Sequence, residues 1–180
     1  MSDGTLIPSV SDERDHIQGP ASAPVTLVEY GDYQCPYCGM AYPIVKSLQQ
    51  ALGDRVRFVF RNFPLRDSHP HAEHAAEAAE SAGAQGSFWE MHDTLYENQE
   101  QLEDSDLLAY AKELDLDPNQ VARDLEDGTY VKRVREDFRS GVKSGVNGTP
   151  TFFVNGVRYD EGWNDPDQFL RALRSVAASA

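Results

Sequence analysis

The sequence is poor in basic residues and in cysteine, and it contains no long apolar run. Its 16 lysines and arginines stand against 30 aspartates and glutamates, which gives a formal net charge of −14 at pH 7. Long-range repulsion at this charge opposes binding to nucleic acid and to an anionic membrane surface. No stretch approaches the length of a transmembrane helix. We therefore expect a protein that binds neither nucleic acid nor membrane.

Signal sequences and several common motifs are also missing. Residues 1–19 contain no basic stretch followed by an apolar run, so no secretory signal is visible. This favours a cytoplasmic protein, or a periplasmic or secreted one whose leader has been removed. The sequence has no Walker loop, no HExxH, no GxSxG and no GxGxxG after a strand. We accordingly expect neither a cofactor nor a bound metal.

The residues that are present are sufficient for one domain with an insertion. The chain has 180 residues, of which 40% are hydrophobic, and this proportion can supply a core. Residues 1–23 are polar and rich in turn formers. We expect them to form a loosely held N-terminal arm, with order beginning at Val25.

The first ordered segment is predicted to form a β-α-β unit. β-branched and aromatic residues at 25–33 predict a strand, and Pro36 stands where a helix begins. Helical spacing of apolar residues continues over 40–52, with Gly53 as the expected stop. Residues 56–60 predict a second, buried strand. It should lie parallel to the first because a helix connects the two.

A helical block follows, from about residue 70 to residue 145, and it begins with an alanine-rich stretch. Ser87, Asp117 and either Asp104 or Ser105 are candidate N-caps of successive helices. Short helices in succession predict a helical subdomain that packs on a sheet.

The C-terminal part is predicted to form a hairpin and a helix. Two β-rich runs, 151–154 and 157–159, are separated by Asn155-Gly156, a strong hairpin signal. Asp165 followed by proline marks the start of a terminal helix. The element order is then β-α-β, a helical block, and β-β-α, which indicates an α/β chain.

Both cysteines lie in one motif, Cys35-Pro36-Tyr37-Cys38, where the first strand leads into the helix. Unpaired backbone N–H groups and the helix macrodipole favour a thiolate there, which predicts a lowered pKa for Cys35. Cys35 lies nearer the helix end and is expected to attack a substrate disulfide, while Cys38 resolves the mixed disulfide. Pro36 and Tyr37 are predicted to tune the redox potential.

The same spacing also suits a static disulfide or half of a tetrahedral zinc site. Zinc would need two further ligands, and the candidates are the clustered histidines His69, His71 and His74, because no third cysteine exists. Zinc pairs normally recur as a second two-ligand element at defined spacing, and none is present. The histidine cluster is therefore interpreted first as the polar start of a helix.

Three separated segments resemble the DsbA-like thiol-disulfide oxidoreductases. They are VEYGDYQCPYC, which ends at Cys38, the long helical block, and GVNGTPTFFVNG at 145–156. With the last helix, the resemblance covers about residues 24–177. It implies a thioredoxin fold with a mixed parallel and antiparallel central sheet and an inserted helical subdomain. The expected parts are the arm at 1–23, the two halves of the thioredoxin fold at 24–66 and 146–180, and the subdomain at 67–145.

The resemblance also implies roles for residues outside the cysteine motif. Pro150 would follow a cis peptide bond beside the cysteines and, with Thr149, dock an extended substrate backbone. An ordinary turn proline is the alternative, and many relatives have valine where Thr149 stands. Glu29 would be a buried acid that assists proton transfer from the resolving thiol, as against a solvent-facing strand residue. Tyr33 and Phe63 either line the substrate groove or belong to the core.

These features predict a monomeric enzyme that exchanges disulfides with protein or peptide thiols, with glutathione as a further candidate partner. Two alternatives remain open. The first is a glutathione-dependent transferase or isomerase on the same fold, although such enzymes usually lack the resolving Cys38. The second is a non-enzymatic peptide-binding or chaperone module with a structural cysteine pair. The direction of redox flow also stays open, although a net reductant suits the cytosol.

Overall fold

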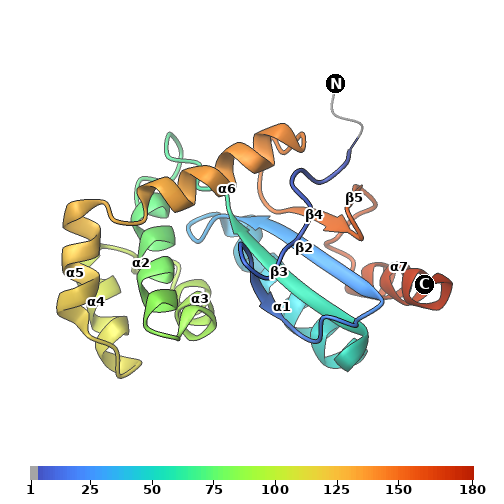
Figure 1. Cartoon of the computed structure of the whole chain (residues 1–180), viewed down its shortest axis with the longest axis horizontal. Helices are drawn as coiled ribbons and strands as arrows, with labels where there is room; N and C mark the ends of the chain where they lie inside the picture. Colours follow the sequence, from blue (N-terminus) through green and yellow to red (C-terminus); the bar gives the residue numbers. More distant parts are fainter. Residues whose placement is uncertain (1–3) are drawn as a thin grey trace. The chain divides into compact units, whose positions relative to one another are not determined.

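The structure, a computed structural model, describes residues 4–180 and combines a β-sheet with helices (Figure 1). Its residue contacts divide the chain into two compact units. Among the described residues, the sheet unit comprises 4–31, 40–61 and 139–180, and the helical unit comprises 32–39 and 62–138. Both units are therefore discontinuous in sequence.

Within residues 4–180, the sheet unit is built on a five-stranded sheet that mixes parallel and antiparallel neighbours. The strand order is β1-β3-β2-β4-β5, and the pairs β1–β3, β2–β4 and β4–β5 are antiparallel. Helix α1 connects β2 to its neighbour β3, which is the crossover that a β-α-β unit requires. The bounds are β1 (His16–Gln18), β2 (Val25–Gly31), α1 (Pro36–Leu52), β3 (Val56–Asn62), β4 (Thr151–Val154), β5 (Val157–Tyr159) and α7 (Pro166–Ser179). The predicted fold class is confirmed.

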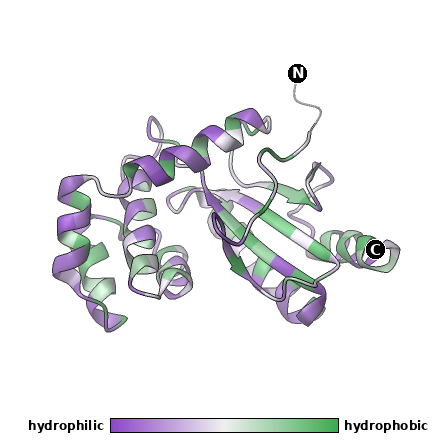
Figure 2. Ribbon diagram, in the orientation of Figure 1, coloured by the Kyte–Doolittle hydropathy of each residue, from purple (hydrophilic) through white to green (hydrophobic). Residues whose placement is uncertain are grey.

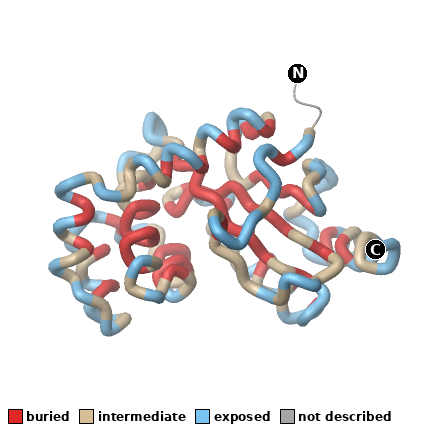
Figure 3. The backbone as a smooth tube through the Cα atoms, viewed as in Figure 1, coloured by how far each residue is buried: buried red, intermediate tan, exposed pale blue. Residues whose placement is uncertain are grey.

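Strands β2 and β3 carry most of the core of the sheet unit because they lie in the middle of the sheet. Six of the seven residues of each strand are buried. A strand that is covered on both faces must be apolar at successive positions, and VTLV in β2 and FVF in β3 meet this requirement. Figure 2 shows hydrophobic residues along both strands, and Figure 3 shows the same strands as buried.

The helices and the hairpin of the sheet unit begin and end where the sequence predicts. α1 ends immediately before Gly53, which has a φ of +53°, a conformation that glycine adopts readily. The carboxylate of Asp165 caps α7 by accepting a hydrogen bond from the N–H of Gln168. β4 and β5 pair around Asn155-Gly156, and both of these residues have a positive φ.

The N-terminal segment differs from the loosely held arm that we expected. β1 pairs with β3, so order begins before Val25, and Thr5 forms an isolated bridge with Val157. The carboxylate of Asp15 accepts hydrogen bonds from the buried guanidinium of Arg61 at 2.8 and 3.0 Å. The polar composition of this segment was misleading because part of it belongs to a buried ion pair rather than to a solvated surface.

The helical unit is organised around α2. Its helices are α2 (Ala72–Ala84), α3 (Phe88–Glu97), α4 (Asp104–Glu113), α5 (Pro118–Asp127) and the first part of α6 (Val131–Lys143). Nine residues of α2 are buried, as Figure 3 shows along most of this helix. Its alanines are small enough for α3, α4 and α5 to pack against it. No helix formed by residues 4–180 is both long and apolar enough to cross a membrane.

The N-termini of these helices follow the predicted caps in part. Asp117 caps α5 by accepting hydrogen bonds from two backbone N–H groups. Ser87 precedes α3, but its side chain makes no capping hydrogen bond. The N-cap of α4 is Glu103 rather than Asp104 or Ser105. Its N–H donates to a carboxylate three residues later, which satisfies the first turn in the manner of a capping box.

The limits of the helical unit differ from 67–145, the range expected for the inserted subdomain. Helix α6 is continuous and contributes residues to both units. In the helical unit, Phe138 of α6 stacks on Phe63, with ring centroids 4.2 Å apart. In the sheet unit, Ser140 of the same helix forms a 2.7 Å hydrogen bond with Tyr30. A boundary between units that lies inside a helix is marked by no turn and no change of composition, so it cannot be predicted from the sequence.

Candidate active site: the Cys35–Cys38 turn

The two cysteines lie at the start of α1, with Cys35 immediately before the helix and Cys38 in its first turn. Both cysteines are buried, with 3% of Cys35 and 0% of Cys38 exposed. Pro36 suits the first helical position because it lacks the N–H that would have no partner there. Tyr37 is 61% exposed, so it is the side chain that the motif presents to solvent.

Asp32 holds the turn before the helix, and sequence reasoning missed this residue. Its Oδ1 accepts hydrogen bonds from the N–H groups of Gln34 at 2.8 Å and of Cys35 at 3.2 Å. Its Oδ2 accepts from the N–H of Leu65 at 2.8 Å and contacts His69 Nδ1 at 2.7 Å. An aspartate that stands shortly before a helix and can cap free N–H groups was the available signal.

A glutamine from the helical unit holds the other side of the same turn. Gln99 Nε2 donates hydrogen bonds to the carbonyl oxygens of Tyr33 at 2.8 Å and of Cys35 at 2.9 Å. Its side chain occupies the space that a Cβ at Gly39 would need, so only glycine fits there without displacing it. Sequence reasoning missed Gln99 because no local pattern distinguishes a glutamine that acts 64 residues away.

The aromatic residues near the motif belong to the core of the helical unit. Tyr33 is 1% exposed, and its hydroxyl forms a 3.0 Å hydrogen bond with Nδ1 of the buried His92. Its ring lies 4.9 Å from the ring of Tyr96. Phe63 is also buried, in the stack described above. The structure therefore supports the interpretation that Tyr33 and Phe63 belong to the core rather than line a substrate groove.

The remaining predicted site residues lie in the sheet unit. Glu29 is a residue of β2 that pairs in register with Phe152, and it is 2% exposed. The alternative that it faces solvent is therefore wrong. The peptide bond between Thr149 and Pro150 is cis, and this pair directly precedes β4. The cysteines belong to the helical unit, so the grouping of all these residues into one site stays a prediction.

The three clustered histidines have separate surroundings. His69 contacts Asp32, as described above, and His74 Nδ1 lies 2.6 Å from a carboxylate oxygen of Asp104. Burial lowers the pKa of His74, but the hydrogen bond and charge of Asp104 outweigh this effect and leave the pKa raised. His71 precedes the first residue of α2. Across residues 4–180, no three or more His, Cys, Asp or Glu side chains are arranged to hold a metal ion.

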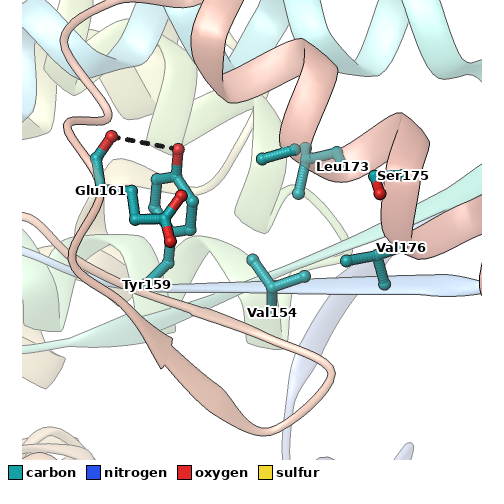
Figure 4. A pocket seen from close by; sticks show the side chains of 7 residues that line it. Val154, Tyr159, Glu161, Leu173, Ser175 and Val176 are labelled. Carbon is teal, nitrogen blue, oxygen red and sulfur yellow. Dashed lines mark hydrogen bonds between the residues drawn. The ribbon is translucent and has the colours of Figure 1, made fainter.

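A pocket of about 280 Å³ lies elsewhere, between the β4–β5 hairpin and α7. Figure 4 shows Val154, Leu173 and Val176 at this pocket, with Tyr159 and Glu161 beside them. The Tyr159 hydroxyl donates a hydrogen bond to the Glu161 carbonyl oxygen at 3.3 Å. None of the predicted site residues lines this pocket, and its walls are mainly apolar.

The fold and the cysteine turn together define the class. A thioredoxin-type sheet whose first long helix opens on Cys-x-x-Cys is the arrangement of thiol-disulfide oxidoreductases. Residues 11–174 match the family model described as thioredoxin, and the chain therefore belongs to the thioredoxin family.

Solved structures place the chain beside DsbA-like proteins within that family. BdbD from Bacillus subtilis, in its oxidised form, superposes with a TM-score of 0.83 and 28% identity, over 93% of this chain and 95% of that one. A thioredoxin-like oxidoreductase from Silicibacter pomeroyi gives a TM-score of 0.79 and 30% identity, over 94% and 95% of the two chains. Wolbachia pipientis α-DsbA1, with a TM-score of 0.80 and 16% identity over 97% and 95%, shares the fold. The predicted resemblance is confirmed.

The curated relatives are longer proteins, and they are named as Na(+)/H(+) antiporters. The protein named Na(+)/H(+) antiporter NhaA 1 of Salinispora arenicola is 48% identical over 97% of this chain. One of the same name from Mycobacterium sp. is 43% identical over 95% of this chain. The matched regions are only 26% and 28% of those proteins, so the chain spans about a quarter of the length of the curated relatives that it matches.

Proposed function

We propose that this chain is a DsbA-like thiol-disulfide oxidoreductase that exchanges disulfides with protein or peptide substrates. The observation that carries the proposal is the Cys35-Pro36-Tyr37-Cys38 turn, which places two cysteines at the N-terminus of a helix. Backbone N–H groups and the helix macrodipole favour a thiolate at that position. The similarity to an oxidoreductase that shares 30% of the residues supports the same class of reaction.

The reaction begins when the thiolate of Cys35 attacks one sulfur of a substrate disulfide. A mixed disulfide forms, and the other substrate sulfur leaves as a thiolate. Cys38 then loses its proton and attacks the sulfur of Cys35, which forms the Cys35–Cys38 disulfide and releases the second substrate thiolate. The substrate gains two electrons and the enzyme loses two. A dithiol or glutathione restores the enzyme, and the reverse sequence oxidises a substrate dithiol.

Glu29 is assigned the role of proton acceptor for Cys38. Its burial in β2 supports this assignment, because a desolvated carboxylate binds a proton more readily than an exposed one. We expect Glu29→Gln to slow the resolution of the mixed disulfide by about 100-fold while leaving the attack by Cys35 almost unchanged. Rapid-quench measurement of the mixed disulfide separates the two steps, and equal slowing of both would remove Glu29 from this role.

Thr149 and Pro150 are assigned to substrate binding, and Pro36 and Tyr37 to redox tuning. A proline offers no N–H of its own, so the backbone groups of Thr149 remain available to an extended peptide. Tyr37 is exposed and able to contact a substrate. We expect Pro150→Ala, which adds an N–H beside the backbone groups of Thr149, to raise the KM for peptide disulfides more than it lowers the kcat.

Insulin reduction with dithiothreitol tests the proposed activity. Wild-type protein should accelerate the precipitation of insulin chains, and Cys35→Ser should abolish the acceleration, because a hydroxyl does not replace the thiolate nucleophile. Ser47→Ala, an exposed position on the same helix, is the matched control and should retain full activity. Full activity of Cys35→Ser would show that the assigned nucleophile is wrong.

Cys38→Ala separates the proposal from a glutathione-dependent transferase or isomerase. Without the resolving thiol, the mixed disulfide between Cys35 and a substrate should accumulate and be recovered on non-reducing gels. A transferase would instead retain its activity on a glutathione conjugation substrate in this variant.

Resistance of the cysteine pair to reduction separates the proposal from a chaperone or peptide-binding module. A structural pair should resist glutathione and show no thiolate absorbance near neutral pH. A redox-active pair should equilibrate with glutathione. The same titration gives the reduction potential, which decides between a net oxidant and a net reductant, and glutathione itself is thereby tested as a partner.

The names of the curated relatives favour a second candidate, in which the substrate is a membrane cation antiporter. The matched part of those proteins corresponds to almost the whole of this chain. A region similar to this chain therefore lies within a longer protein that is named as an antiporter, and this observation favours the candidate. Trapping with Cys38→Ala in cells, followed by identification of the captured protein, tests this candidate. Recovery of soluble proteins alone would exclude it.

The remaining proposals concern the oligomeric state of the chain and the cellular compartment in which it acts. The chain is proposed to act as a monomer in a reducing compartment, where a Cys-x-x-Cys pair serves exchange rather than structural cross-linking. Sedimentation equilibrium tests the monomer. Fractionation of cells that express the gene tests the cytoplasmic location against a periplasmic or secreted one.

A further inference from the structure

Asp32 places a carboxylate against the reactive turn. Three backbone N–H groups, from Gln34, Cys35 and Leu65, donate to its two oxygens, and His69 Nδ1 contacts one of them. A backbone N–H can only donate, so these contacts use the carboxylate as an acceptor on both oxygens. Three backbone N–H dipoles therefore point at this one side chain, an arrangement that stabilises negative charge on it.

This charge is buried and lacks a strong counter-ion. Asp32 is 1% exposed. Among residues 4–180, its ion-pair contact is with His69, and neither a lysine nor an arginine lies within salt-bridge distance of it. Backbone dipoles and one imidazole therefore stabilise the carboxylate, and water does not screen it. Its field therefore acts more strongly on neighbouring groups than the field of a solvent-exposed carboxylate would.

The neighbouring group of interest is the sulfur of Cys35. The N–H of Cys35 that donates to Asp32 is three bonds away from that sulfur. A fixed negative charge beside this N–H repels a thiolate on Cys35 and opposes the attraction of the helix N-terminus. The thiolate exists only when the pair is reduced. Whatever disfavours the thiolate therefore disfavours the reduced pair relative to the disulfide.

We propose that Asp32 is a positioning residue that lowers the reduction potential of the Cys35–Cys38 pair and so biases the enzyme toward reducing its substrates. This inference rests on the proposed function. It adds a charged group outside the Cys-x-x-Cys motif to the tuning by Pro36 and Tyr37. Asp32 also contacts the N–H of Leu65 and Nδ1 of His69. The segment that contains these two residues holds the carboxylate in place and so contributes to the reduction potential of the cysteine pair.

The equilibrium with glutathione measures the effect directly. The reduced enzyme and one glutathione disulfide give the Cys35–Cys38 disulfide and two molecules of glutathione, with two electrons passing from the enzyme. We expect Asp32→Asn to lower the equilibrium constant of this oxidation by about three- to tenfold, since removal of the charge stabilises the thiolate. The thiolate absorbance of Asp32→Asn should also appear at lower pH than that of the wild type.

Asp124→Asn is the matched control. Asp124 is a buried aspartate of the same unit whose carboxylate accepts hydrogen bonds from the side chains of Ser81 and Gln120, and it lies outside the catalytic machinery. This variant should leave the glutathione equilibrium at the wild-type value. An equal shift in both variants would assign the effect to loosening of the helical unit and overturn the proposal.

A second variant and one measurement on the wild type cover the case in which Asp32→Asn does not fold. Asp32→Ser keeps a hydroxyl acceptor for the N–H groups of the turn but carries no charge, so it should shift the equilibrium in the same direction. In unmodified protein, the carboxyl carbon resonance of Asp32 should follow the titration of Cys35 in the reduced form and stay constant in the oxidised form. A constant resonance in both forms would overturn the proposal.

The outcomes distinguish this inference from the proposed function. If wild-type protein never forms the Cys35–Cys38 disulfide in any glutathione buffer, the proposed function fails. If the wild type equilibrates normally and folded Asp32→Asn and Asp32→Ser give the wild-type constant, the proposed function stands and the role of Asp32 is refuted.

Discussion

Among single residues, Glu77 is a buried acid that affects how stability depends on pH. It lies on α2, it is 2% exposed, and its Oε2 has no hydrogen-bond partner among the described residues. Burial raises the pKa of Glu77 to about 7, while His74 lowers it and Glu73 raises it further. Around neutral pH this carboxyl group is therefore divided between its neutral and charged forms, and the charged form is the costly one inside the protein.

The sign of the pH effect follows from the position of this pKa. The folded protein binds more protons than the unfolded chain between about pH 4.5 and about pH 7, so unfolding becomes easier as the pH rises through this range. We expect Glu77→Gln to increase the free energy of unfolding by about 1–3 kcal/mol at pH 8 and to change it little at pH 5. Urea denaturation at the two pH values measures the difference.

The exposed Glu126 of α5 provides the control for this prediction, because no burial opposes its charge. Glu126→Gln should leave the pH dependence of unfolding as it is in the wild type. A Glu77→Gln variant that is equally stabilised at both pH values would indicate better packing by the amide and would contradict the electrostatic explanation.

Among the elements, β1 is attached to the sheet by a buried ion pair. Arg61 donates hydrogen bonds to the carboxylate of Asp15, to the hydroxyl of Tyr30 and to the carbonyl oxygen of Pro8. Burial raises the pKa of Asp15, but the hydrogen bond and charge of Arg61 outweigh it and leave the pKa lowered. The contribution of this pair to stability is therefore complete at neutral pH. It is lost as the pH falls below 3.8 and through the lower folded-state pKa.

Removal of one charge should release this N-terminal strand. We expect Asp15→Asn to cost about 3 kcal/mol or more of unfolding free energy, because it leaves the guanidinium of Arg61 buried without its counter-ion. Hydrogen exchange should quicken first in β1 and in its partner β3. Asp12→Asn is the control, since Asp12 is exposed and lies 3.9 Å from Arg57. Unchanged exchange in β1 of Asp15→Asn would refute this account.

The elements that could be predicted from the sequence are those determined by local chemistry. The start of α1 at Pro36, the hairpin at Asn155-Gly156 and the cap at Asp165 each depend on residues within a few positions of one another. The contacts that hold the cysteine turn could not be predicted in this way. Asp32 acts on a residue 33 positions away, and Gln99 on one 64 positions away. Their partners are determined by tertiary structure alone.

The candidate site shows the same division. Cys35 and Cys38 were identifiable because the motif, the preceding strand and the following helix are contiguous. The burial of Glu29 followed from its apolar neighbours on β2. The attachment of the N-terminal segment cannot be predicted in this way, because polarity in sequence does not distinguish a solvated charge from a paired one, and the partner of Asp15 lies 46 residues away.

For the whole molecule, the dominant electrostatic quantity is the formal net charge of −14. Such an excess of one sign repels itself in the compact state and destabilises it. Exposed ion pairs such as Lys132–Glu136 contribute little in return. The buried pair of Asp15 and Arg61 is hardly reached by salt. Screening should therefore weaken the repulsion more than it weakens the attractions.

We accordingly expect the thermal unfolding midpoint to rise when sodium chloride increases from low to physiological ionic strength, by about 2–4 °C for each kcal/mol of repulsion removed. Calorimetry across a salt series measures this slope. Replacing the adjacent exposed acids Glu126 and Asp127 by lysine reduces the net charge by four, so this variant should show a smaller slope. If the midpoint of the wild type fell as salt was added, attractive pairs rather than self-repulsion would govern the stability of the chain.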